Sequence, residues 1–224
     1  MVQPGLVEEL STRLRSADAY NLPMADILNI STYRFVAIDD PQALQHQLKT
    51  RALDLDLKGT ILISPEGINL FLAGLGSHVQ AFMKALREDP RFADLPTKDS
   101  WSDHIPFRKM LVKVKREIIR MNHPTIRPAE GRAPAVDART LRRWLDQGHD
   151  DEGRPVVTLD TRNAFEVDYG TFKNALHFNI EKFTEFPAAI SAHKEELADK
   201  TLVSFCTGGI RCEKSGLYMR EIGM

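Results

Sequence analysis

The feature that most constrains the fold is an apolar strand pattern that runs directly into a cysteine, two glycines and a helix. Residues 201–205 (TLVSF) form a short apolar run typical of a buried strand. Cys206-Thr207-Gly208-Gly209-Ile210-Arg211 follows without a break, and a helical pattern begins at about Cys212. A strand, a glycine-rich loop and a helix in this order are typical of an α/β fold with a parallel sheet.

Residues 136–224 continue the alternation of strands and helices. A helix containing Leu141, Trp144 and Leu145 is expected to end at Gly148. Two further strands are expected at 155–160 (PVVTLD) and 175–178 (ALHF), and 182–199 reads as largely helical. Alternating strands and helices predict a parallel sheet with helices on both faces.

Residues 30–121 combine strand and helix periods in a different order. Asp40-Pro41 is typical of a helix start, and Gly59 is expected to end that helix. Ser77 with Gln80 predicts a capping box for a second helix. Strands are expected at 33–38, 60–64 and 68–73, and one or two further strands are expected within 107–119. This βαββαβ order predicts a ferredoxin-like α+β domain.

The two predicted domains are flanked and joined by shorter segments. Residues 1–29 form a lead-in arm in which the apolar spacing predicts a short amphipathic helix. Residues 122–135 hold three prolines and one glycine, so they form either a linker or a strap across a domain surface. The expected divisions are therefore 1–29, 30–121, 122–135 and 136–224.

Composition excludes several classes of protein. The 224 residues are 42% apolar and 27% charged, which is ordinary for a globular chain. The net charge of −1 excludes a uniformly basic coat, although not a local basic patch. Two cysteines exclude a disulfide framework and suit a reducing cytosol. Because no signal peptide or run of ~20 apolar residues is visible, we expect a cytoplasmic protein with no membrane partner.

Cys206 is the strongest candidate for chemistry. At the start of a helix, unpaired N–H groups and a partial positive charge favour an anion. Gly208 and Gly209 allow successive N–H groups to turn inward, and Arg211 adds a full positive charge. We therefore predict a lowered pKa and a nucleophilic sulfur at Cys206. Cys212 is either a packing residue or a resolving thiol, and the cysteine spacing fits no common metal site.

The loop Cys206-Thr207-Gly208-Gly209-Ile210-Arg211 resembles the active-site loop of rhodanese sulfurtransferases. Asp160-Thr161-Arg162, followed by Glu166 and Gly170, resembles a second rhodanese pattern. Asp160 and Arg162 are therefore expected to support the loop. Thr171 departs from the histidine that is usual at its position in rhodaneses.

Longer motifs narrow the resemblance. CTGGIRCEKS (206–215), DTRNAFEVDYGTFKNA (160–175) and GTILISPEGIN (59–69) resemble the rhodanese-like tRNA uridine hydroxylases. This resemblance implies oxygen-dependent formation of 5-hydroxyuridine at the tRNA wobble position, with Cys206 essential. It implies tRNA as partner and molecular oxygen as co-substrate; no other cofactor and no obligate protein partner is evident. It also implies a further strand and helix after Met224, so we expect the rhodanese domain to be incomplete at its C-terminus.

Evidence for RNA binding in the residues themselves is weaker. Lys113 and Lys115 share one face of an expected strand, and Arg116 follows, so these three are candidate tRNA contacts. The alternative is a solvated strand face. Four aromatic residues could stack on bases, although aromatics in such segments usually belong to the core; they are Tyr33, Phe71, Trp101 and Phe107.

Three hypotheses on function stay open at this point. The first is tRNA uridine hydroxylation. The second is a rhodanese-type sulfurtransferase that carries a persulfide on Cys206. The third is a non-catalytic binding or regulatory module, for which replacement of Cys206 would change nothing in a cell.

Overall fold

The computed structural model describes residues 26–224, and its N-terminal domain is built on a five-stranded sheet in the order β4-β1-β3-β2-β5. The predicted amphipathic helix within 1–29 lies outside the described residues. All strand pairs are antiparallel except β2 with β5. The elements are β1 (Ile27–Phe35), α2 (Pro41–Asp54), β2 (Lys58–Ser64), β3 (Gly67–Leu75), α3 (Gly76–Leu86), the 3-10 turn η1 (Pro90–Phe92), β4 (Lys98–Ser102) and β5 (Met110–Val114).

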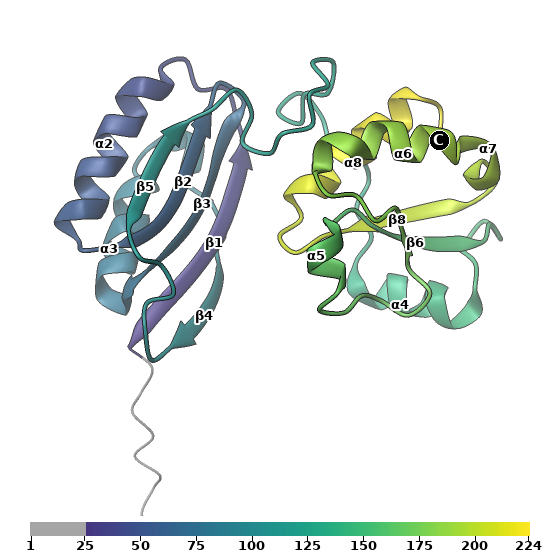
Figure 1. Cartoon of the computed structure of the whole chain (residues 1–224), viewed down its shortest axis with the longest axis horizontal. Coiled ribbons are helices and arrows are strands. Elements are labelled where there is room, and N and C mark those ends of the chain that lie inside the picture. Colours follow the sequence, from purple (N-terminus) through teal and green to yellow (C-terminus); the bar gives the residue numbers. More distant parts are fainter. Residues whose placement is uncertain (1–25) are drawn as a thin grey trace, which may run out of the picture.

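Both long helices of this domain cover one face of the sheet (Figure 1). Asp40 caps α2 by accepting a hydrogen bond from the backbone N–H of Ala43, and Pro41 begins the helix. The helices bury their apolar stripes against alternate side chains of β1, β2 and β3, such as Ile30, Ile61 and Leu70. The ferredoxin-like core predicted from the sequence is therefore present.

The last strand of that core is not where the sequence placed it. β4, which completes the βαββαβ order, has the polar sequence KDSWS and is largely exposed at the sheet edge. It carries no apolar alternation, so its pattern did not indicate a strand. The predicted strand within 107–119 is shorter, β5 (Met110–Val114), and it adds a fifth strand parallel to β2.

Three local predictions are wrong in detail. β1 begins at Ile27, inside the segment assigned to the lead-in arm. Gly59 does not end α2 but lies in β2, where a side chain would meet the carbonyl oxygen of Phe71 at 2.0 Å. Ser77 forms no capping box: α3 already begins at Gly76, and no side chain caps it.

The C-terminal domain has a three-stranded parallel sheet in the order β7-β6-β8. Helices lie on both faces of this sheet, as predicted (Figure 1). α8 begins two residues earlier than the sequence indicated, so Arg211 and Cys212 lie in its first turn. The elements are α4 (Ala138–Gln147), β6 (Val156–Asp160), α5 (Ala164–Val167), β7 (Leu176–His177), η2 (Phe183–Glu185), α6 (Phe186–Ala192), α7 (Lys194–Leu197), β8 (Thr201–Phe205) and α8 (Ile210–Glu221).

The segment between the two sheets packs on the C-terminal domain. Met121 and Ile126 are buried in the second hydrophobic core, together with residues of α6 and α8. Ala133 lies against Gly216 of α8, where an added Cβ would come within 2.7 Å of the alanine Cβ. Part of this segment is thus a strap across the domain surface. Within residues 26–224, every helix is too short or too polar to cross a membrane.

Candidate active site

Cys206 follows β8 directly and lies at the carboxyl end of the parallel sheet, as the sequence predicts. Gly209 has a left-handed backbone (φ 95°) and is the N-cap residue of α8. This turn lets the backbone N–H of Gly209 donate a hydrogen bond to Cys206 Sγ at 3.0 Å. The backbone donors at this sulfur are Gly209 and Arg211, so of the two glycines in the predicted anion-binding turn only Gly209 contacts it.

Several groups lower the pKa of Cys206 to about 5. The largest effect is a hydrogen bond from the thiol of Cys212, and burial opposes it. The positive charge of Arg211 and the N–H groups of Arg211 and Gly209 lower the pKa further. Cys206 is thus a thiolate at neutral pH, as nucleophilic chemistry requires.

Cys212 lies in the first turn of α8 and donates its S–H to the sulfur of Cys206. That contact, with burial and the negative charge of Cys206, raises the pKa of Cys212. Its sulfur is also 4.0 Å from the hydroxyl oxygen of Thr161. The structure brings both sulfurs together, and a role for Cys212 as a resolving thiol stays a prediction.

Arg211 pairs with Glu166 while it stays close to the sulfur of Cys206. Its two terminal nitrogens lie 2.6 and 2.7 Å from the two carboxylate oxygens of Glu166, and only 8% of Arg211 is exposed. The hydroxyl of Thr207 donates to the same carboxylate at 2.7 Å. Burial opposes ionisation of Glu166, but the bonds from Arg211 and Thr207 outweigh it and lower its pKa to about 2. Ile210, which precedes Arg211 in the chain, is buried.

Glu166 contacts the Cys206 loop through Thr207 and Arg211, and its place in the rhodanese-like pattern is its one signal in the sequence. In α5 the Glu166 carboxylate also accepts the backbone N–H of Asn163 at 3.2 Å, which helps to hold it beside the Cys206 loop. Arg211 therefore anchors the loop, while its charge still acts on Cys206.

Asp160 and Arg162 brace the neighbouring loop. Asp160 ends β6, beside Phe205, and accepts hydrogen bonds from Arg162 at 2.6 to 3.1 Å. Arg162 also donates to the carbonyl of Gly170 at 2.6 Å, and the hydroxyl of Thr171 donates to Asp160 at 2.8 Å. The predicted supporting pair thus fixes residues 162–171 against the base of the Cys206 loop.

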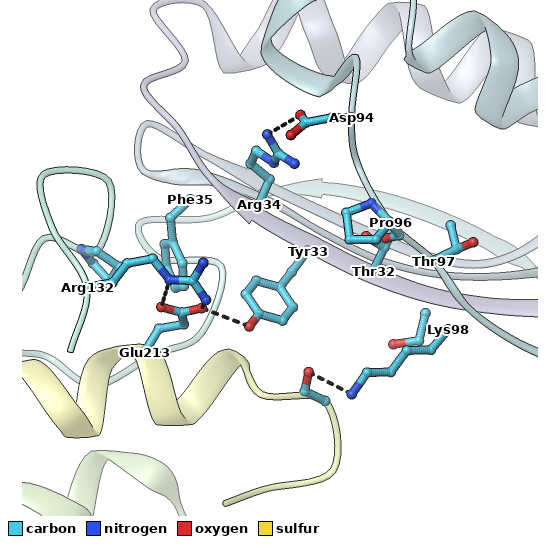
Figure 2. A pocket seen from close by; sticks show the side chains of 13 residues that line it. Thr32, Tyr33, Arg34, Phe35, Asp94, Pro96, Thr97, Lys98, Arg132 and Glu213 are labelled. Carbon is cyan, nitrogen blue, oxygen red and sulfur yellow. Dashed lines mark hydrogen bonds and ion pairs between the residues drawn. The ribbon is translucent and has the colours of Figure 1, made fainter. Parts of the chain in front are cut away.

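The N-terminal domain reaches the same loop through two side chains (Figure 2). Lys98 of β4 donates to the carbonyl oxygen of Gly208 at 3.1 Å. The hydroxyl of Tyr33 donates to Glu213 of α8 at 3.1 Å, and a Cβ at Gly209 would lie 3.0 Å from that hydroxyl. Burial, followed by the charge of Glu213, raises the pKa of Tyr33. Neither contact was predicted from the sequence.

A cavity of about 480 Å³ lies between the two domains beside this loop. Figure 2 shows Tyr33 and Lys98 on its N-terminal wall, with Glu213 and Arg132 opposite. Arg132 donates to Glu213 at 2.9 Å, and Arg34 donates to Asp94 at 2.7 Å. The cavity lining thus holds part of the Cys206 loop, three cations and two carboxylates, and Lys98 is the one of these cations that is not paired with a lining carboxylate.

The three predicted tRNA contacts lie elsewhere. Lys113 is in β5, at the opposite sheet edge from β4, and Lys115 and Arg116 follow it. All three are exposed. Because β5 lies at the sheet edge opposite β4, which contacts the Cys206 loop, a role of these residues in tRNA binding would be remote from the reacting group.

Lys214 of α8 joins the two domains through a buried ion-pair cluster. It is 1% exposed, and its ammonium group lies 2.9 Å from Glu66 and 2.7 Å from Glu117. Burial raises the pKa of Glu66, and Lys214 only partly offsets this. Within residues 26–224, no group of three or more His, Cys, Asp or Glu side chains is arranged to hold a metal ion.

Comparisons with known proteins agree with these motifs. Residues 27–118 match a family model described as a UPF0176 acylphosphatase-like domain. Proteins of Delftia acidovorans and Variovorax paradoxus, both named tRNA uridine(34) hydroxylase, are 67% and 64% identical over 90% of this chain and 76% of their own length. A Bordetella avium protein of the same name is 60% identical over 88% of this chain and 82% of its own. The chain belongs to the tRNA uridine(34) hydroxylase family.

Proposed function

We propose that this protein hydroxylates C5 of uridine 34 in tRNA, giving 5-hydroxyuridine, with Cys206 as the catalytic nucleophile. The observation that carries the proposal is the Cys206 thiolate in a loop whose Gly208 lines an interdomain cavity, in a chain 67% identical to a protein named for this activity. The cavity volume of about 480 Å³ is in the range of sites that hold small ligands. A flipped nucleotide is such a ligand.

Covalent addition gives the thiolate a role in oxidising C5. The sulfur of Cys206 bonds to C6 of the uracil, and the electron pair of the C5–C6 bond makes C5 electron-rich. One atom of O₂ then bonds to C5, and the other leaves as water with two protons and two electrons from an external two-electron donor. The oxygen on C5 takes a proton from water, and the C5 proton passes to water as the double bond forms again and the thiolate leaves.

The surrounding residues prepare this step without reacting. Gly209 N–H and the Cys212 thiol stabilise the thiolate before addition and after its release. Glu166 holds Arg211 and Thr207 so that the loop keeps its curvature. Molecular oxygen and tRNA are part of the proposal, and a cytoplasmic location follows from the substrate.

Nucleoside mass spectrometry of tRNA tests the proposal. Cells without any route to 5-hydroxyuridine are supplied with the intact gene, with Cys206→Ser, or with Lys49→Glu as a control on the exposed side of α2. We expect 5-hydroxyuridine derivatives with the intact and Lys49→Glu genes only. If the intact gene gives no 5-hydroxyuridine and the purified protein transfers sulfane sulfur to cyanide, the sulfurtransferase hypothesis is supported instead.

A further inference from the structure

One face of the five-stranded sheet is left uncovered by α2 and α3, and it is turned toward the C-terminal domain (Figure 1). Strand pairing determines which side chains share this face, because directly opposite residues point the same way. Ser31 of β1 is paired with Phe71 of β3 and with Lys98 of β4. Two rows of side chains lie on this face: Lys98, Ser31, Phe71, Thr60 and Leu111, and then Tyr33, Asn69, Leu62 and Lys113. The first row is the open one at its centre, because Asn69 in the second row is buried and donates to the carbonyl oxygen of Ile118.

The chemistry of this open face differs from that of an ordinary solvated sheet. Phe71 is 42% exposed although it lies on the central strand of the sheet. The charged side chains at the strand positions of this face are all lysines, namely Lys58, Lys98 and Lys113, and none of the described strand positions there holds a carboxylate. An exposed ring on a face whose charged strand positions are all lysines matches the two components of a nucleic acid, the flat base and the phosphate.

We propose that this open face binds the unpaired nucleotides of the tRNA anticodon loop, an inference that rests on the proposed function. Bases stack on Phe71, and Lys58 and Lys113 contact the phosphates on either side. Sheets of this topology bind single-stranded RNA by stacking bases on aromatic side chains of the open face. Phe71 and the strand that contains Lys113 are separate candidates for RNA contact in the sequence, and the sheet places them on one face.

The open face leads directly to the reactive cysteine. Lys98, which shares a row with Phe71, also contacts the carbonyl oxygen of Gly208 in the Cys206 loop. Tyr33, in the next row, lies over Gly209. A nucleotide that extends beyond Phe71 toward these residues enters the interdomain cavity beside Cys206. The sheet thus holds the flanking nucleotides while the target base reaches the sulfur.

Binding of a fluorescent anticodon stem-loop RNA to the otherwise intact Cys206→Ser protein tests this inference by anisotropy. Phe71→Leu keeps an apolar side chain but removes the ring, and we expect it to weaken binding at least about fivefold. Lys113→Glu should weaken binding and lower the slope of log K against log salt by about 0.7 or more. Lys49→Glu makes the same charge change on α2, outside the open face, and should bind like the parent. Thermal melting of each variant shows whether it is folded.

Each alternative result has a definite meaning. If Phe71→Leu and Lys113→Glu bind as tightly as Lys49→Glu, the open face is not the RNA surface, while the mass-spectrometric test of function stands independently. Equal competition by a fully paired RNA duplex would overturn the preference for unpaired nucleotides. If the parent binds no RNA, or if Phe71→Leu instead dissociates a dimer seen by light scattering, the inference is also overturned.

Discussion

The ammonium group of Lys214 lies 2.9 Å from the carboxylate of Glu66, although 148 residues separate them in the chain. Glu66 is in the turn between β2 and β3, and it also accepts the backbone N–H of Ile118 at 2.8 Å. Glu117 completes the cluster, accepting from Lys214 at 2.7 Å. Two sequence motifs that are far apart in the chain, one around each residue, thus meet in a buried ion pair between the domains.

Replacement of Lys214 by alanine should destabilise the protein strongly. Lys214 is 1% exposed, so its removal leaves two carboxylates partly buried without their cation. Breaking a buried pair in this way costs about 3–5 kcal/mol. Urea unfolding would measure the loss, with Lys49→Ala on the surface of α2 as the control. A loss below about 1 kcal/mol would show that the cluster contributes little to holding the domains together.

The reactivity of Cys206 should depend on Cys212. With a pKa of about 5, Cys206 is a thiolate above that pH, so its alkylation rate should be constant at neutral pH and fall as pH drops through 5. Cys212→Ala removes the largest cause of the lowered pKa and should move the midpoint upward. Rates of iodoacetamide labelling across pH measure this. An unchanged midpoint in Cys212→Ala would mean that Arg211 and the loop N–H groups alone stabilise the thiolate.

The Cys206 loop could be predicted because all of its parts are contiguous. The strand, the glycines, Arg211 and the helix start lie within a dozen residues, and local rules describe each of them. The partner of Arg211 could not be predicted in the same way. Glu166 is 45 residues away, and only the packing of α5 beside the loop brings the two together.

The contribution of the N-terminal domain to the site could not be predicted from the sequence for a related reason. Lys98 lies on β4, whose polar edge sequence has no apolar alternation, so the strand itself was missed. The sequence indicates that Tyr33 is either a stacking residue or a core residue. Its contact with Glu213 depends on how the two domains pack. Periodicity predicts which face of an element is buried, but not which distant element covers it.

Glu166 should give the protein part of its resistance to acid. Its pKa is about 2 in the folded state, below the usual value of 4.5, so its contribution to the free energy of unfolding is complete above about pH 4.5 and is lost as pH falls toward 2. Glu166→Gln should cost about 2 kcal/mol at neutral pH and less at pH 3. Chemical denaturation at both pH values tests this. A cost that is equal at both would mean that the charge of Glu166 is not responsible.

Mild peroxide should link Cys206 to Cys212. Peroxide oxidises the Cys206 thiolate to a sulfenic acid, with the second oxygen leaving as water, and the adjacent Cys212 sulfur then displaces water to form the disulfide. The sum is two thiols and one hydrogen peroxide giving one disulfide and two waters. Intact mass spectrometry should show a loss of about 2 Da, reversed by dithiothreitol. Cys212→Ser should instead accumulate a sulfenic acid that dimedone traps. If the wild-type protein also gives the dimedone adduct and no mass loss, the neighbouring thiol only stabilises the thiolate and does not resolve it.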